Sequence, residues 1–286
     1  MTEILLSISR IALLIFLLAS MSAVGLSLTF SQILAPLRSL KTVTATLLGN
    51  FVFVPLLAIG TAKLFRLDEP FAVGLLLLGL APGAPFLPKL VELVNGDLAL
   101  SVGVMALLMC GTVLVLPLVL PLLLAGVKVG VWQIARPLLL LMFAPLAFGL
   151  ILRAAHEGWA ARLRPGLGLA SNVSLLTVLV LIVTLNLPSV LKVFGTGAIG
   201  AGIVFTVLAG VVGHVLGGRV IGTRKVMVLG TSFRNIAAAL VVGEEDFHDP
   251  QVLVMLVVAA FVGVVLVLPV MLVWRKQESP AQALAH

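Results

Sequence analysis

Long apolar runs recur along this chain, and they restrict what it can fold into more than any other feature. Runs of about 17 to 25 apolar residues can cross the hydrocarbon core of a bilayer as helices. Hydropathy predicts nine such spans, at residues 4–30, 42–62, 71–94, 98–125, 133–152, 171–191, 198–218, 226–243 and 250–274. With 61% hydrophobic and 10% charged residues, the chain has too little polar surface to cover a water-soluble globule. We therefore expect an all-helical polytopic membrane protein.

Two of the predicted spans carry features that hydrocarbon does not tolerate. The eighth, VMVLGTSFRNIAAALVVG, places Arg234 and Asn235 side by side at its middle. The third is interrupted at APGAPFLP by three prolines and a glycine, namely Pro82, Gly83, Pro85 and Pro88. An ionisable group at membrane depth needs a partner, and the freed backbone of a broken helix must face protein or a water-filled cavity. Together they predict a transporter with a binding site near the bilayer midplane, where two broken helices cross.

Charged residues set the expected orientation. With the N-terminus outside, the predicted inner loops hold 11 of the 18 basic residues, the outer loops five and the spans two. Cytoplasmic loops are enriched in Lys and Arg, so we expect a cell-membrane protein with a cytoplasmic C-terminus. All 11 carboxylates lie at span ends or in loops, which argues against a proton relay or cation site built on a buried acid. Glu92 follows Lys89 by one helical turn, and we expect an ordinary ion pair near the inner surface.

Other chemistry has little support in the sequence. The single cysteine, Cys110, excludes an internal disulfide and a cysteine-cluster metal site. No HExxH, GxSxG or P-loop pattern is present, and no basic stripe is interleaved with aromatic residues. A membrane-embedded enzyme would need an acid, a nucleophile or a metal cluster within a span. We therefore expect neither an enzyme nor a nucleic-acid-binding protein, and no metal centre.

The order of the spans indicates two related halves within one transporter domain, residues 1–286. The broken third span and the interrupted eighth span are each followed by one further span. Residues 1–125 and 133–274 would then be inverted repeats, with the first lacking its opening helix. Residues 275–286 are expected to form a short cytoplasmic tail. The sixth span is unusually polar, and helix packing and cavity lining both remain open for its Asn172, Ser174, Thr177, Thr184 and Asn186.

Four segments follow the pattern of a known family. They are GLSLTFSQILAPLRSLK at 25–41, GNFVFVP at 49–55, the APG break running into NGDLALSVGV at 95–104, and RKVMVLGTSFRN at 224–235. Over nearly the whole chain these segments resemble the bile acid:sodium symporter family. The resemblance implies a panel domain and a core domain, with two unwound helices crossing in the core and organic anions bound between the domains. It also implies nine-span members that lack the first of ten helices.

The sodium ligands implied by the resemblance are largely absent from the two broken spans. Where the family has a glutamate, a glutamine and an asparagine on the eighth-span motif, this chain has Gly230, Arg234 and Asn235. Where the family has a serine and an asparagine at the third-span break, this chain has Leu87 and Pro88. The resemblance therefore implies that sodium coupling is weakened or lost.

A residual ion site is implied at a few remaining positions. Ser101 keeps a family serine, but the threonine one turn later has become Met105, and Asn50 takes the place of a glutamine. Thr231 and Phe233 correspond to the positions that offer backbone carbonyls. By itself, Ser101 more often satisfies a helix carbonyl than binds an ion. Asn50 could order a neighbouring broken helix or line the cavity.

Arg234 offers a replacement for bound sodium. In the family pattern two sodium ions beside one glutamate leave a local charge of about +1, and one arginine without an ion also gives about +1. Arg234 would support an anionic substrate directly or by holding the crossing together, or it would only cap freed carbonyls. The residues expected at the substrate or crossing site are Arg234, Asn235, Asn50, Pro82, Gly83, Pro85, Pro88 and Ser232.

These observations predict a secondary transporter that works by alternating access. Its substrate would be an organic anion, bile-acid-like or another amphipathic carboxylate or sulfonate. Two alternatives stay open, a sodium-coupled symporter with a reduced sodium site and a non-transporting membrane sensor that keeps the fold. The expected partners are the small organic anion and the lipid bilayer, and no resident cofactor is expected.

Overall fold

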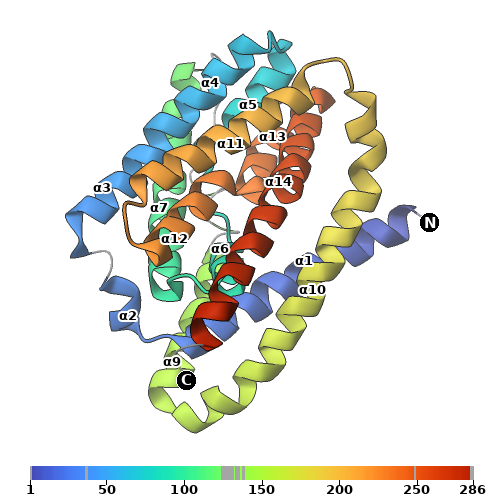
Figure 1. Cartoon of the computed structure of the whole chain (residues 1–286). Coiled ribbons are helices and arrows are strands. Elements are labelled where there is room, and N and C mark those ends of the chain that lie inside the picture. Colours follow the sequence, from blue (N-terminus) through green and yellow to red (C-terminus); the bar gives the residue numbers. More distant parts are fainter. Residues whose placement is uncertain are drawn as a thin grey trace.

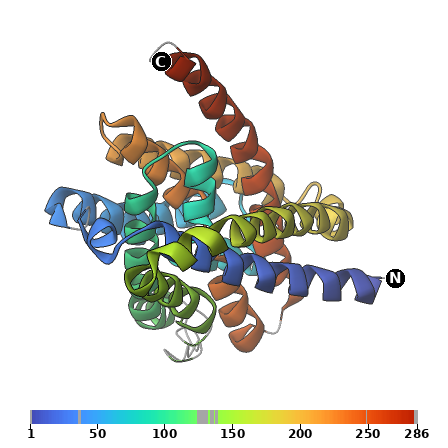
Figure 2. The ribbon, with the colours of Figure 1, turned by 90° about the horizontal axis from the view of Figure 1, so that it is seen from below.

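Helices form all of the regular structure in the part of the chain that the computed structural model describes, which is residues 2–35, 38–123, 132, 136, 139–247 and 249–283. They fall into two groups by their contacts (Figure 1). The first group contains α1 (Thr2–Ser27), the π-helical turn η3 (Leu139–Phe143), α9 (Ala144–Ala155) and α10 (Glu157–Lys192). In it, α1 packs along both α9 and α10. Figure 2 shows α1 and α10 running side by side.

The second group surrounds the two broken helices. Its first members are α3 (Leu40–Leu48), the π-helical turn η2 (Gly49–Phe53), α4 (Val54–Leu64), α5 (Glu69–Leu80), α6 (Leu87–Leu93) and α7 (Leu98–Leu123). Its others are α11 (Ala198–Leu216), α12 (Ile221–Ser232), α13 (Ile236–Asp246) and α14 (Pro250–Ala283). In this group α5 packs on α4 and α14, and α11 packs on α12 and α14. The short α2 (Phe30–Leu34) contacts α7, and α14 also touches α10, so both elements connect the groups.

The structure interrupts both spans that the sequence marks as broken. The third predicted span ends as α5 at Leu80 and resumes as α6 at Leu87. The eighth ends as α12 at Ser232 and resumes as α13 at Ile236. The two breaks meet, because the backbone N–H of Asn235 donates to the carbonyl of Ala81 at 2.7 Å.

Five described helices are long and apolar enough to cross a membrane. They are Ser7–Ser27, Leu40–Leu64, Leu98–Leu123, Ala198–Leu216 and Gln251–Arg275, and they coincide with the first, second, fourth, seventh and ninth predicted spans. The third and eighth spans are divided into shorter helices. The predicted fifth span begins in residues 133–138, most of which lie outside the described residues. The count of nine spans therefore remains a prediction.

Two helices are longer than the sequence predicts. The sixth span was expected at 171–191, but α10 has 36 residues and begins at Glu157. At about 1.5 Å per residue this helix is about 54 Å long, so it exceeds the thickness of a bilayer. In addition, α14 continues to Ala283, which makes residues 275–283 of the expected tail helical, while residues 284–286 lie outside the described part. Figure 2 shows this end of α14 leaving the bundle.

Glycines bring α1 and α9 into backbone contact. A Cβ atom added at Gly25 would overlap the carbonyl oxygen of Leu146 and lie 3.0 Å from the Cα of Gly149. A Cβ added at Gly149 would meet the carbonyl oxygen of Ser22 in the same way. Helices in membranes use such small residues to approach closely, because dispersion contacts rather than hydrophobic burial hold them together.

Gly25→Ala is therefore expected to lower the unfolding temperature of the purified protein. One added methyl group forces the two backbones apart, and overpacking of this kind costs about 1–3 kcal/mol. Gly166→Ala in α10 is the matched control, because nothing lies within 4 Å of a Cβ at that position. In the control, the only effect is the higher helix propensity of alanine, which stabilises the helix by up to about 1 kcal/mol. In thermal unfolding measurements, the unfolding temperature should therefore fall in Gly25→Ala and rise in Gly166→Ala. Equal changes in the two variants would contradict the close approach of α1 and α9.

Candidate functional site

A π-helical turn presents Asn50 to the crossing of the broken helices. Asn50 lies in η2, between α3 and α4, and is buried. Its Nδ2 donates to the carbonyl of Thr46 at 3.0 Å, one turn earlier, which leaves Oδ1 free to accept from another element. Single π-helical turns within longer helices occur frequently at functional sites.

Arg234 joins three elements through its guanidinium group. Its Nε donates to the carbonyl of Leu78 at 3.1 Å, and its Nη1 donates to Oδ1 of Asn50 at 2.6 Å. Its Nη2 donates to the carbonyls of Gly79 and, at 3.4 Å, Asn50. The carbonyls of Leu78 and Gly79 belong to the last turn of α5, where the break removes the donors that a continuing helix would supply. The arginine therefore replaces missing backbone donors and ties the eighth-span break to α5 and η2.

The charge of Arg234 is solvated by dipoles rather than by a carboxylate. The side chain is 2% exposed, and the only ion pair in the described part of the chain joins Lys89 and Glu92. A cation near the C-terminal end of α5 also interacts favourably with the helix dipole. The result is a fixed positive charge at the crossing, held by carbonyl oxygens and one amide.

Asn235 shapes the other side of the same break. Its Oδ1 accepts from the backbone N–H of Ala238 at 3.1 Å and so caps the N-terminus of α13. Its Nδ2 is buried and has no partner among the described residues. The neighbouring Phe233 stacks edge to face on Phe86 of the third-span break, with ring centroids 5.5 Å apart. The two breaks are thus joined by an aromatic pair as well as by hydrogen bonds.

The third-span break is held against α7. Gly83 has a φ of +85°, in the left-handed region, and a Cβ there would lie 2.8 Å from the backbone nitrogen of Met109. The carbonyl of Pro82 accepts from Oγ1 of Thr112 at 2.9 Å. Pro85 lies in the turn of the break, and Pro88 occupies the first turn of α6, where a missing N–H costs nothing.

The positions implied as a residual ion site make bonds within their own helices. Oγ of Ser101 donates to the carbonyl of Leu98 at 2.6 Å, and Oγ1 of Thr231 donates to the carbonyl of Met227 at 2.9 Å. A Cβ at Gly230 would face the side chains of Leu87 and Val104 at 3.4 and 3.7 Å. Where the resemblance places a glutamate, the surroundings are therefore apolar. Oγ of Ser232 lies 3.0 Å from the Cβ position of Gly210, so it is turned toward α11.

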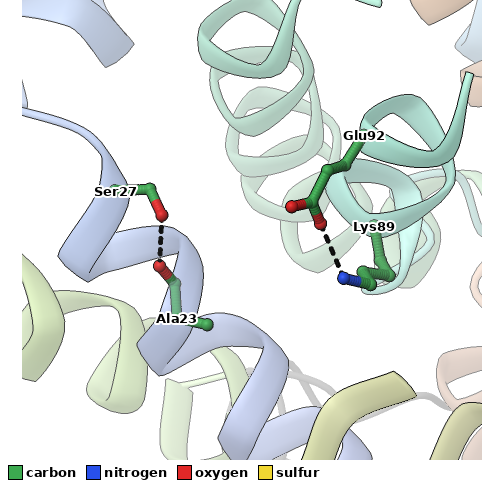
Figure 3. A network of polar contacts seen from close by, with 4 residues as sticks. All are labelled: Ala23, Ser27, Lys89 and Glu92. Atoms are coloured by element: carbon green, nitrogen blue, oxygen red, sulfur yellow. Dashed lines mark hydrogen bonds and ion pairs between the residues drawn. The ribbon is translucent and has the colours of Figure 1, made fainter. Parts of the chain in front are cut away.

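A cavity with polar and apolar lining residues lies between the two groups of helices. The family resemblance implies a binding site between two domains, but most of the residues that line this cavity were not predicted. It has a volume of about 550 Å³. Leu98 at the start of α7 lines it. Three other elements contribute its polar lining residues, which are Ser20 and Ser27 of α1, Lys89 and Glu92 of α6, and Arg164, Ser171 and Asn172 of α10. Figure 3 shows the Lys89–Glu92 pair on one side of this space and Ser27, bonded to the carbonyl of Ala23, on α1 across from it.

The cavity contains unsatisfied hydrogen-bond donors. Oγ of Ser20 and Oγ of Ser171 are buried and have no partner among the described residues. The expected pair of Lys89 and Glu92 is present, with Nζ and Oε2 2.7 Å apart. Asn172 supplies the only sequence signal for this site, since it was one of the polar residues noted in the sixth span. Thr177 and Thr184 of that span instead donate to carbonyls of α10 itself, and the side chain of Asn186 lies outside the described part.

Lys225, which the sequence placed in a loop, is buried, as are Arg234 and Lys89. The structure puts it in the first turns of α12, with Nζ 2.6 Å from the carbonyl of Val94 just after α6. Because α6 also follows the third-span break, this contact and the Arg234 network connect the same two broken helices at two points.

Two broken helices that meet at a buried arginine, beside five helices long enough to cross a membrane, define the class of helical secondary transporters. Residues 13–193 match the family model described as the Sodium Bile acid symporter family, and the chain belongs to this family. The resemblance read from the sequence is thereby confirmed. The protein is a multi-pass membrane protein of a transporter family and not an enzyme. The match includes Asn50, Pro82 and Ser101 and ends before Arg234.

Two curated proteins of Arabidopsis thaliana are similar to the chain over most of its length. One is named probable sodium/metabolite cotransporter BASS6, chloroplastic, and is 26% identical over 273 residues, which cover 91% of this chain. The other is named probable sodium/metabolite cotransporter BASS5, chloroplastic, and is 25% identical over 272 residues, which cover 90% of this chain. The chain spans 66% and 67% of the length of these relatives.

Proposed function

We propose that this protein moves an organic anion across the cell membrane by alternating access, without strong sodium coupling. The observation that carries the proposal is the cavity between the two groups of helices, with Lys89, Arg164 and two unsatisfied serine hydroxyls in its lining. Its volume of about 550 Å³ suits a small organic molecule. Positive charge favours a carboxylate or a sulfonate.

The two groups of helices correspond, in this proposal, to the panel and core domains that the family resemblance implies. The group of α1, α9 and α10 forms the panel, and the group with both broken helices forms the core. The two halves of the chain, 1–125 and 133–274, are the inverted repeats, and the N-terminus lies outside. Movement of the core against the panel opens the cavity to one side of the membrane and then to the other.

Weak sodium coupling follows from the contacts of Arg234. Its donors already satisfy the carbonyls of Leu78 and Gly79 and both oxygens of Asn50, which are the kind of ligand that a hard cation would take. Arg234 is not among the residues that line the cavity. These contacts favour a role in holding the crossing together over direct contact with the substrate.

A sodium-coupled symporter with a reduced site is the second candidate. The printed names of both plant relatives, sodium/metabolite cotransporters, favour it. Its remaining ligands would be Ser101, Asn50 and the backbone carbonyls of Thr231 and Phe233. Oδ1 of Asn50 already accepts from Arg234, and Oγ of Ser101 already donates to a carbonyl of α7.

Uptake by reconstituted protein separates these candidates. We expect proteoliposomes to take up labelled taurocholate, which serves as a probe amphipathic anion. An inward sodium gradient should raise the uptake rate less than about twofold over a matched potassium gradient. An ion that binds equally to both conformations of the carrier, or to neither, cannot shift the transport equilibrium. Protein-free vesicles are the control. Strong stimulation by sodium would select the symporter. Saturable binding without flux would instead identify a non-transporting sensor.

A further inference from the structure

Three ionisable side chains line the cavity, and their charges do not cancel. Lys89 and Glu92 form an ion pair at 2.7 Å, with the lysine buried and the glutamate half-exposed. Arg164 is exposed and has no ion-pair partner among the described residues. The formal charge of the lining is therefore +1, and Arg164 carries it.

We propose that Glu92 is a specificity-determining residue that limits the substrate to a single negative charge. This inference rests on the proposed function and assigns the charge class of the same substrate. One acid group can pair with Arg164 by charge-assisted hydrogen bonds. A second acid group would find Lys89 already neutralised by Glu92, and it would meet the glutamate as a like charge.

The rest of the lining offers donors but no further charge. The hydroxyl oxygens of Ser20 and Ser171 have almost no accessible surface, whereas Asn172 is exposed, so its amide can donate to a neutral acceptor of the substrate such as a hydroxyl or carbonyl oxygen. Ser171 lies seven residues after Arg164 on α10, two helical turns along the same face. The preferred ligand is thus a monoanion with its acid group at Arg164 and an uncharged polar group near Asn172.

Substrate cannot readily take the place of Glu92 on Lys89. Among the described residues, the ion-pair partner of the buried lysine is Glu92. Both residues belong to α6, one helical turn apart, so the pair is intramolecular and constantly available. An incoming carboxylate would have to displace Glu92, and the freed glutamate would then compete with the substrate for Arg164, the other cation of the described lining. The pair therefore acts as a fixed neutral unit toward the ligand.

Glu92→Gln tests the proposal because it changes the lining from +1 to +2 while nearly keeping side-chain volume. The probes are octane-1-sulfonate and octane-1,8-disulfonate, which differ in charge and remain ionised at all working pH values. Their binding is measured by calorimetry on protein in nanodiscs. We expect the wild-type protein to bind the monosulfonate more tightly than the disulfonate. In Glu92→Gln, the affinity for the disulfonate relative to the monosulfonate should rise by about tenfold. This is the size of one added charge interaction at an intermediate dielectric constant.

Two further variants control the experiment. Glu157→Gln removes the same charge at an exposed position at the start of α10 that does not line the cavity, so it should leave the preference unchanged. Lys89→Met combined with Glu92→Gln restores the lining to +1 and should restore the wild-type preference. A wild-type protein that binds both probes equally, or a Glu92→Gln protein with unchanged preference, would overturn the inference. Binding of neither probe by the wild type, together with no taurocholate flux, would instead remove the proposed function.

Discussion

Arg234→Met should destabilise the protein more than any other single substitution considered for the crossing. Methionine has a similar length but no donor, so the carbonyl of Gly79 and both oxygens of Asn50 lose the donors that Arg234 supplies. The carbonyl of Leu78 keeps only its 3.3 Å bond from the backbone N–H of Ala81. Leaving a buried acceptor without its donor costs about 1–3 kcal/mol, and several acceptors are affected here, so a total of about 3–5 kcal/mol is expected. For a chain of this size that corresponds to a fall of about 10 °C in unfolding temperature. Thermal unfolding in detergent, followed by size-exclusion chromatography, measures it.

Matched variants separate the network from the loss of a charge. Arg219→Met removes an exposed arginine in the loop before α12, and a change of less than about 0.5 kcal/mol is expected there. Arg234→Lys keeps the charge but offers one compact ammonium in place of a planar fork, so it should fall between the wild type and Arg234→Met. Wild-type stability in Arg234→Met would show that the arginine does not hold the crossing.

Gly83→Ala is the second substitution with a large expected effect. The residue has a φ of +85°, and a left-handed conformation costs an L-residue about 1–2 kcal/mol. The new Cβ would also lie 2.8 Å from the backbone nitrogen of Met109 and 3.1 Å from the carbonyl carbon of Leu108, and such overpacking adds about 1–3 kcal/mol. The two costs together predict a clear fall in unfolding temperature in the same chromatographic assay.

Gly218→Ala is the control for this prediction. Gly218 also has a positive φ, +67°, but nothing lies within 4 Å of a Cβ at that position. It should show the conformational cost alone, and the difference between the two variants measures how tightly the third-span break is pressed against α7. Equal losses in Gly83→Ala and Gly218→Ala would mean that the break can move away from Met109.

The breaks in the two helices were predictable for different reasons. Proline lacks an N–H and clashes with the preceding turn, so Pro82 and Pro85, which flank Gly83, favour an interruption. Proline alone does not determine one, because α7 continues through Pro117 and Pro121. The eighth span contains no proline. Its interruption was inferred from Arg234 and Asn235 alone, and the structure supplies the reason, because Asn235 caps a new helix and Arg234 satisfies carbonyls of another.

The partners of Arg234 could not be predicted from the residues themselves. Asn50 lies 184 residues earlier in the chain, and a hydropathy pattern carries no information on such a contact. Nor was η2 predicted, although a signal exists. Both π-helical turns end two residues before a proline, at Phe53 before Pro55 and at Phe143 before Pro145, and each proline removes an N–H that a regular helix would use.

In the cavity, too, contacts between residues close in sequence could be predicted, whereas contacts between distant helices could not. The spacing of Lys89 and Glu92 predicted their ion pair, because residues three apart are neighbours on a helix. Ser20 and Ser171 gave no comparable signal. A lone serine in an apolar helix commonly bonds to its own backbone, and only the packing of α1 against α10 shows that these two do not.

Arg234 is part of the chain, whereas a sodium ion leaves with its substrate, and this difference affects the energetics of a transport cycle. A carrier that keeps its positive charge and moves one monoanion transfers one net negative charge per turnover. With an inside-negative potential of 100 mV, entry of that charge is opposed by about 2.3 kcal/mol and exit is favoured by the same amount. A buried guanidinium at the crossing would thereby turn the membrane voltage from an aid to accumulation into a driving force for export.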